Sequence, residues 1–358
     1  MQSNLSVSVL PSLLGFVLFC FGCAKEPTPA VETSTQASTA AAATATGPVT
    51  LQGSGASFPA PIYSRWFKEF STKNPNVRVN YQATGSGAGV KAFIEGQTDF
   101  GASDAAMTDE EIKQAKDGVS LLPITAGNIV LGYNLDEVKD VKLTRKAYVG
   151  IFLGEIKKWN DPEIAKANPD VKLPEKDITV VHRSDGSGTT FVFTQHLAAI
   201  SPAWKPGKGT SVDWPVGVGG RKNDGVAALI AQTPGSIGYV EYAFAVSSKM
   251  AMASLENKAG KFVAPTLEGS KKALEGVKLP EDLRAWVTDP EGEAAYPIVT
   301  YTWILSKKKY ADPAKGAAIK QLLTWCLTEG QKVSEELHYV PLPEAVSQQV
   351  LQAVNTIQ

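Results

Sequence analysis

Three segments of the chain repeat one pattern, in which a short apolar stretch leads into a turn of glycine and serine and then into apolar residues at helical spacing. The turns lie at residues 53–59, 84–89 and 185–190. Strands that alternate with helices predict an α/β fold with parallel strands. Ligands of such folds bind beyond the carboxyl ends of the strands. The three turns therefore form one site if they line the same cleft.

The turn at residues 185–190 indicates an anion site. It follows the β-branched run 178–181 and precedes the apolar segment 191–197, so it lies at a predicted helix N-terminus. The first N–H groups of a helix lack internal partners and its dipole is positive at this end. Arg183 lies just before the turn, and its glycines let a ligand approach the backbone closely. Together these features suit a small oxyanion; taken alone, an ordinary capped strand–helix turn remains the alternative.

Other ligand classes fit the sequence less well. The pattern G-x-x-x-x-G-K-[ST] is absent, and the first two turns have Phe58 and Val90 where a dinucleotide-binding turn needs glycine. The 35 basic and 36 acidic residues leave a net charge of −1. Because a nucleic-acid binder usually carries a basic excess or stripe, we expect no nucleic-acid partner.

Catalytic and metal-site patterns are also missing from the sequence. Its histidines are His182, His196 and His338, which are far apart and belong to no H-E-x-x-H or Cys/His cluster. Neither Ser86 nor Ser187 stands in the G-x-S-x-G pattern of a serine nucleophile. We therefore predict no metal, no cofactor and no enzymatic reaction.

The N-terminus reads as a leader followed by a tether. Residues 9–22 are apolar but too few for a membrane span, as in a signal-peptide core. Cys23 then follows a glycine, as at a bacterial lipoprotein cleavage site, although Cys20 stands where leucine is usual. We predict a signal peptide over 1–23 with lipidation at Cys23. Residues 24–48, rich in Ala, Thr, Ser and Pro, predict a flexible tether.

The cysteine count agrees with this reading. Once Cys20 leaves with the leader and Cys23 carries lipid, Cys326 is the one remaining thiol, so no intrachain disulfide is expected. Cys326 shares helical spacing with Ile319 and Leu322. We therefore expect it to be a buried small hydrophobic residue.

Five longer motifs carry a family resemblance. They are G-S-G-A-S-F-P-A-P-I-Y from Gly53, D-F-G-A-S-D from Asp99, K-K-W-N-D from Lys157, R-S-D-G-S-G-T from Arg183 and G-S-I-G-Y-V-E-Y from Gly235. From about Leu51 to the C-terminus the chain resembles the phosphate-binding proteins of bacterial phosphate-specific ABC importers. This resemblance implies a two-domain, type II periplasmic-binding-protein-like α/β fold, with a hinge and a phosphate ligand in the interdomain cleft.

The resemblance also implies a set of phosphate ligands. They are Ser57, Phe58 through its backbone N–H, Ser86, Asp104, Arg183, Ser187, Gly188 and Thr189. Ser57 replaces a threonine that is common in the family. Because the hydroxyl is retained, its role should be retained with a less constrained rotamer.

Asp104 has a chemical role that can be argued without the family. Phosphate at neutral pH keeps at least one proton, which a carboxylate can accept, whereas sulfate has none. Leaving a buried acceptor unpaired costs roughly 1–3 kcal/mol, or about one to two decades of selectivity. The alternative is that Asp104 only caps a helix that begins ahead of Glu110.

The segment around Arg183 also allows two interpretations, which differ in the role of Asp185. Arg183 offers a planar, permanently charged donor for an oxyanion. Asp185, two residues later, either holds that guanidinium in place or serves as the cap of the following helix. The sequence leaves both open.

The domain boundaries follow from a C-terminus that returns to the first domain. Crossings near residues 124–126 and 297–299 make 49–125 and 298–358 domain I and 126–297 domain II, so that both domains grip the anion. We predict a monomeric, extracytoplasmic, lipid-anchored phosphate receptor that delivers its ligand to the membrane permease of an ABC transporter. A receptor for sulfate or arsenate, a secreted phosphatase, and a starvation sensor or adhesin remain alternatives.

Overall fold

The computed structural model describes residues 48–136 and 138–358. The predicted signal peptide, Cys23 and all of the predicted tether except Pro48 lie outside the described residues. Among the described helices, none is both long enough and apolar enough to cross a bilayer.

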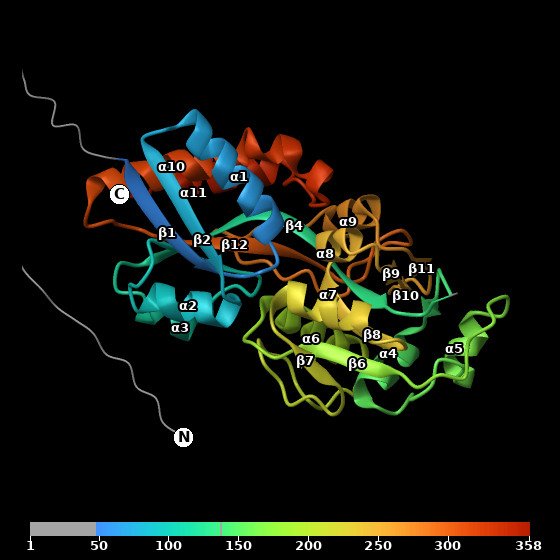
Figure 1. The fold of residues 1–358 in the computed structure, drawn as a ribbon. Coiled ribbons are helices and arrows are strands. Elements are labelled where there is room, and N and C mark those ends of the chain that lie inside the picture. The colour runs from blue at the N-terminus through green and yellow to red at the C-terminus, as the bar shows by residue number, and fades with distance from the viewer. Residues whose placement is uncertain (1–47, 137) are drawn as a thin grey trace, which may run out of the picture. The chain divides into compact units, whose positions relative to one another are not determined.

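The three predicted strand–turn–helix units are present. In each, a short strand leads through the glycine and serine turn directly into a helix (Figure 1). The units are β1 (Val49–Gly55) with α1 (Ala60–Lys73), β2 (Val77–Ala83) with α2 (Ser86–Ile94), and β6 (Thr179–Arg183) with α6 (Gly188–Ile200). A further strand, β3 (Phe100–Ser103), ends directly before Asp104. All of the polar turns thus follow the carboxyl ends of strands.

These strands belong to one large mixed sheet with the order β2-β1-β3-β12-β4-β8-β6-β7. At one end β1 runs parallel to β2 and β3, and at the other β6 runs parallel to β7 (Val218–Gly220) and β8 (Ser236–Glu241). We call these groups the β1 half and the β6 half. The α/β prediction is confirmed, but the middle of the sheet is antiparallel rather than parallel.

Two long strands form that antiparallel middle. β4 (Val119–Tyr133) pairs with β12 (Val299–Lys307) as far as Asn128, and with β8 from Ile129 onward. Near-continuous burial along both strands explains why they carry no alternating pattern. This change of partner lies near the predicted crossings at 124–126 and 297–299. The division into domains I and II remains a prediction.

Helices cover both faces of the sheet. Figure 1 shows α1, α10 (Pro313–Leu327) and α11 (Glu344–Asn355) on one side of β1 and β2, with α2 and α3 (Asp109–Gln114) on the other. The remaining helices are α4 (Arg145–Leu153), α5 (Pro162–Ala167), α7 (Lys222–Gln232), α8 (Tyr242–Ser247) and α9 (Leu267–Leu274). The short strands are β5 (Lys142–Leu143), β9 (Ala251–Met252), β10 (Ser254–Glu256) and β11 (Phe262–Val263).

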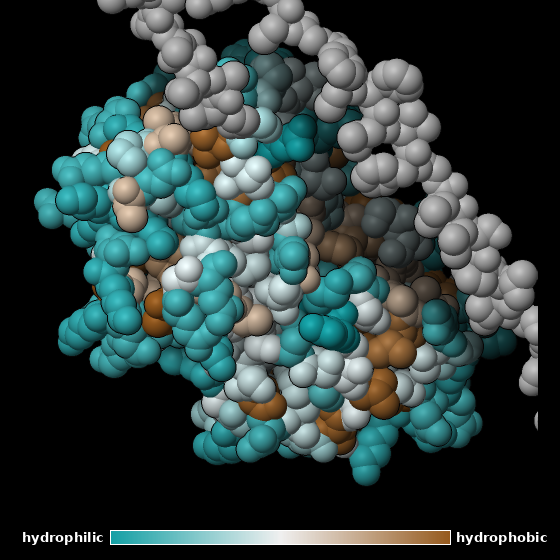
Figure 2. All heavy atoms as spheres, turned by 60° about the vertical axis from the view of Figure 1, so that its left-hand side comes forward, coloured by the Kyte–Doolittle hydropathy of each residue, from teal (hydrophilic) through white to brown (hydrophobic). Residues whose placement is uncertain are grey.

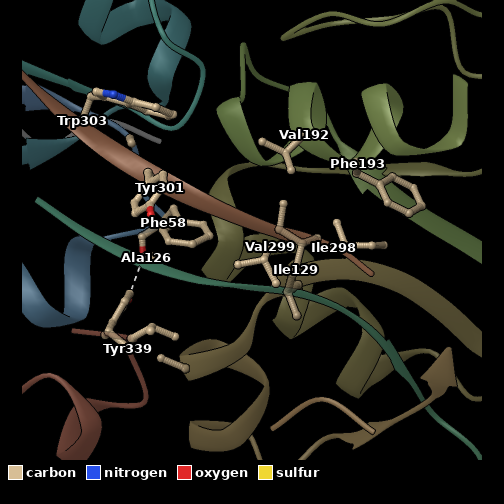
Figure 3. Close-up of a cluster of buried hydrophobic side chains, with 14 of the residues drawn as sticks. Phe58, Ala126, Ile129, Val192, Phe193, Ile298, Val299, Tyr301, Trp303 and Tyr339 are labelled. Atoms are coloured by element: carbon tan, nitrogen blue, oxygen red, sulfur yellow. Dashed lines mark hydrogen bonds between the residues drawn. The ribbon is translucent and has the colours of Figure 1, made fainter. Parts of the chain in front are cut away.

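Aromatic residues connect the core to the predicted site. Phe58 is fully buried, its ring lies edge-on to Tyr339 at 6.2 Å, and its carbonyl accepts a 2.7 Å hydrogen bond from the Tyr339 hydroxyl (Figure 3). The apolar face of α1, formed by Ile62, Tyr63, Trp66, Phe67 and Phe70, is buried, and Cys326 is buried as predicted. The molecular face in Figure 2 is mostly hydrophilic, with hydrophobic residues in small patches. The buried hydrophobic core therefore packs against the backbone of the turn at residues 53–59.

Candidate functional site

The predicted turns meet between the two halves of the sheet. The Gly87 N–H, at the start of α2, donates to the Gly186 carbonyl at 3.0 Å. A Cβ atom placed on Gly188 would lie 2.6 Å from Ser86 Oγ and 2.8 Å from the Asp104 nitrogen. Only glycine permits this approach. The turns that follow β2, β3 and β6 therefore pack directly against one another.

Arg183 is buried in this cluster and is held by Asp185. The Arg183 side chain is only 1% exposed, and its Nε and Nη2 donate to the two carboxylate oxygens of Asp185 at 2.8 and 2.7 Å. Burial raises the pKa of Asp185, but the bonds and charge of Arg183 and the Lys222 N–H outweigh it and hold the pKa below its ordinary value. Both groups stay charged, so the guanidinium has a fixed orientation.

The choice left open for Asp185 is thereby resolved. Ser187 caps α6, because its Oγ accepts the Thr190 N–H at 3.0 Å. Asp185 orients Arg183 and does not cap the helix. Its Oδ1 also accepts the Lys222 N–H at 2.9 Å, which connects the turn after β6 with the start of α7.

Asp104 is a buried carboxyl on the β1 half of the site. It is 2% exposed, it accepts the Thr302 hydroxyl at 2.8 Å, and Ser86 Oγ lies 3.4 Å away. Burial raises its pKa to about 7, against the lowering effects of Thr302, the Arg183 charge, Ser86 and Thr189. The carboxyl therefore exchanges its proton near neutral pH, whereas the sequence argument treats it as ionised.

The alternative role of Asp104 as a helix cap is wrong. The cap of α3 is Thr108, whose hydroxyl accepts the Glu111 N–H while the Glu111 side chain accepts the Thr108 N–H. Asp104 lies outside this reciprocal arrangement and faces the buried cluster instead.

The N-terminus of α6 supplies further polar groups. Ser187 and Thr189 are fully buried, and the Arg183 Nη1 lies 3.4 Å from Thr189 Oγ1. Gly188 and Thr189 are the first residues of the helix, so their N–H groups have no partner within it. Guanidinium, hydroxyls and N–H groups converge here opposite one carboxyl.

Ser57 joins the same cluster through a residue that the sequence analysis missed. Ser57 Oγ is 3.1 Å from Asn223 Nδ2, and the same Nδ2 is 3.3 Å from Thr189 Oγ1. Phe58 follows Ser57 and contributes only backbone, since its ring lies in the core. All eight predicted site residues are thus buried around one junction between the two halves.

Sequence reasoning missed two residues of this buried cluster. Asn223 follows Gly219 and Gly220 and opens α7, so the glycine-turn pattern used for the other three segments could have found it. Thr302 lies on the antiparallel strand β12 and reaches Asp104 across the sheet. No local pattern marks such a residue.

The histidines lie elsewhere in the described fold. His182 stacks on Trp214 with ring centroids 5.0 Å apart, and buried His196 is 2.9 Å from the Tyr148 hydroxyl. Across residues 48–136 and 138–358, no group of three or more His, Cys, Asp or Glu side chains is arranged to hold a metal ion.

Comparison with known proteins identifies the family. A model described as the PBP superfamily domain matches residues 34–329. "Phosphate-binding protein PstS" of Xylella fastidiosa (strain Temecula1) is 39% identical over 94% of this chain and 96% of its own. Those of Pasteurella multocida and Methanocaldococcus jannaschii are 43% and 41% identical, covering 84% and 86% of this chain and 88% and 86% of their own. The chain belongs to the PstS family.

Solved structures show the same fold. One is a high-affinity periplasmic phosphate-binding protein (PfluDING) bound with phosphate, with a TM-score of 0.72 and 21% identity over 84% of this chain and 93% of that one. Another, a phosphate-binding protein from Stenotrophomonas maltophilia, has a TM-score of 0.66 and 20% identity over 86% and 94%. The periplasmic-binding-protein-like fold expected from the motifs is confirmed.

The raised pKa of Asp104 predicts a pH dependence of stability. The folded PstS-family chain keeps this proton up to about pH 7, whereas the unfolded chain loses it near 3.8. The resulting stabilisation is complete below the pKa of the unfolded state and is lost as the pH rises to the pKa of the folded state. Without anion, the free energy of unfolding of the wild type should therefore fall relative to that of Asp104→Asn by about 1.4 kcal/mol per pH unit between pH 3.8 and about 7. Denaturant titrations of both proteins test this, and parallel pH profiles would contradict it.

Proposed function

We propose that this protein is an extracytoplasmic receptor that captures inorganic phosphate and delivers it to the membrane permease of an ABC importer. The observation that carries the proposal is the buried junction where the Arg183–Asp185 pair, the N-terminus of α6 and the Asp104 carboxyl meet. Relatives named phosphate-binding protein PstS at 39–43% identity support it. We further propose that the chain has no reaction of its own and acts as a monomer.

The proposed phosphate ligands come from both halves of the sheet. Ser57, the Phe58 N–H, Ser86 and Asp104 follow strands of the β1 half. Arg183, Ser187, Gly188 and Thr189 belong to the β6 half. We assign the first set to domain I (49–125 and 298–358) and the second to domain II (126–297). An anion that contacts both sets favours closure of the hinge between the domains.

The charges of the site suit a protonated oxyanion. Arg183 is neutralised by Asp185, so neutral hydroxyl and N–H dipoles supply the remaining attraction. Asp104 and a bound phosphate can share one proton, since the carboxyl accepts it when ionised. Sulfate brings no proton, so above the Asp104 pKa of about 7 it faces the carboxylate directly. Phosphate is therefore preferred over sulfate.

We also propose that Cys23 anchors the receptor to the membrane. The apolar run 9–22, the cysteine that follows it and the small-residue tether 24–48 support this, and they place the receptor in the periplasm or on the outer face of the cytoplasmic membrane. The anchor keeps the receptor close to its permease.

Removing Arg183 should abolish useful phosphate binding. Arg183→Ala leaves a bound dianion and Asp185 without their cation, at a cost on the order of 3 kcal/mol or more. Isothermal titration with phosphate measures the loss. Arg145→Ala is the matched control, because Arg145 forms an Arg–Asp pair with Asp289 outside the site and should leave affinity unchanged. An Arg183→Ala affinity within threefold of wild type would remove Arg183 from the site.

Asp104→Asn should weaken phosphate binding and narrow the preference for phosphate over sulfate, chiefly because sulfate gains. The amide keeps the size of the carboxyl but can donate a hydrogen bond to an oxyanion that has no proton. Competition titrations of both anions measure the ratio. Asp99→Asn serves as control, since this partly buried carboxylate pairs with Lys315 at the other end of β3. An unchanged ratio in Asp104→Asn contradicts the proton-acceptor role.

A lipid on Cys23 should make the protein partition into the detergent phase. Expressed with its leader in a bacterium, the wild type should partition into detergent, whereas Cys23→Ala should stay in the aqueous phase. Cys326→Ala is the control, because Cys326 is buried in the fold and should not alter partitioning. Equal partitioning of wild type and Cys23→Ala would leave a receptor without a lipid anchor.

A further inference from the structure

The side chain of Asn223 hydrogen-bonds to predicted ligands from both halves of the site, Ser57 and Thr189. It is fully buried at the start of α7. Its Nδ2 donates to Ser57 Oγ at 3.1 Å and to Thr189 Oγ1 at 3.3 Å. Its backbone N–H donates to the same Ser57 Oγ at 3.2 Å. None of the sequence motifs assigns it a role.

The orientation of the Asn223 amide is fixed by its other neighbour. The Glu241 N–H points at Asn223 Oδ1 at 3.0 Å, and an N–H can only donate. The oxygen must therefore face Glu241, and the two hydrogens of Nδ2 must face the two hydroxyls. Asn223 uses both donors and one acceptor, as a buried amide should.

This arrangement decides where the hydroxyl hydrogens point. Ser57 Oγ accepts two hydrogen bonds from Asn223, and Thr189 Oγ1 accepts one from Asn223 and one from Arg183 Nη1. A hydroxyl oxygen has two lone pairs and one hydrogen. With the lone pairs occupied, the Ser57 hydroxyl keeps its hydrogen for the side where the oxyanion is proposed to lie. The Thr189 hydroxyl likewise acts as a donor, and its hydrogen bond to Asp104 lowers the pKa of that carboxyl.

The backbone conformation of Lys222, the residue before Asn223, supports a specific positioning role for Asn223. Lys222 has a φ of +61°, which non-glycine residues adopt rarely and at a cost. In this conformation the Lys222 N–H bonds Asp185 Oδ1, and the next residue turns both its N–H and its side chain toward Ser57. The same turn thus holds the Arg183–Asp185 pair and the hydroxyl of the opposite half.

We propose that Asn223 is a positioning residue for phosphate capture: its amide sets the Ser57 and Thr189 hydroxyls as donors and joins the two halves around the ligand. The proposal rests on the phosphate function proposed above. Asn223 does not need to touch phosphate itself. The part of its contribution that passes through Ser57 should disappear when Ser57 is removed.

A double-mutant cycle tests this coupling. Wild type, Asn223→Ala, Ser57→Ala and the double variant of the full-length protein are titrated with inorganic phosphate. Each single variant should bind on the order of tenfold more weakly. The double variant should lose much less than the product of the two single losses, because both remove the same oriented hydroxyl. Losses that multiply would overturn the proposal.

Two further variants separate positioning from general stability. Asn223→Asp keeps the shape and the Glu241 contact but removes the side-chain donors, so it should also lose affinity; wild-type affinity in this variant would overturn the proposal. Asn257→Ala removes another buried amide, whose Nδ2 donates to the Gly292, Glu293 and Ala295 carbonyls far from the site in sequence. It should lower the unfolding temperature without changing phosphate affinity. A similar affinity loss in Asn257→Ala would show that Asn223→Ala acts through stability alone.

The wild-type titration separates this inference from the proposed function. If the wild type binds no phosphate, the proposed function fails and this inference falls with it. If the wild type binds and Asn223→Ala binds within threefold of it, the inference fails and the proposed function stands.

Discussion

The buried Arg183–Asp185 pair is the interaction on which the rest of the site depends. A guanidinium that is 1% exposed needs a partner, since an isolated buried charge costs several kcal/mol. Asp185 supplies it with two hydrogen bonds and also accepts the Lys222 N–H, so the turn after β6 and the start of α7 are held together. Thr189 contacts the same guanidinium, and Asn223, the residue after Lys222, contacts both Thr189 and Ser57.

The opposite side of the site depends on a single carboxyl. Asp104 is buried between Thr302, Ser86 and the first residue of α6, and burial brings its pKa to about 7. In the receptor that we propose, this carboxyl discriminates between a protonated and an unprotonated oxyanion, and Arg183 and the N-terminus of α6 attract either.

The core places these polar groups at a junction. Phe58 shows how this is done: its ring packs against Tyr339 while its backbone follows Ser57 at the start of α1 (Figure 3). Tyr339 also lies 3.3 Å from Glu241 Oε2, and the Glu241 N–H donates to Asn223. A continuous set of buried contacts therefore joins the aromatic core to the hydroxyls of the site.

The sequence by itself determined the local elements of this protein and most of its candidate site. The strand–turn–helix units and the anion-binding character of residues 183–189 follow from short-range backbone and side-chain preferences, which act within a few residues. The helix cap at Ser187, in contrast, was identified only from the structure. The relatives and solved structures bear out the fold and family that the five motifs indicate.

Only the tertiary structure determined which of these elements pack against one another. The antiparallel pairing of β4 with β12, the Thr302–Asp104 bond and the bridge from Asn223 to Ser57 join residues that lie 166 to 198 positions apart in the sequence. Such pairings depend on how whole elements pack, and no local periodicity encodes them. The same reason explains the pKa of Asp104, since burial and neighbouring dipoles exist only once distant strands have assembled around it.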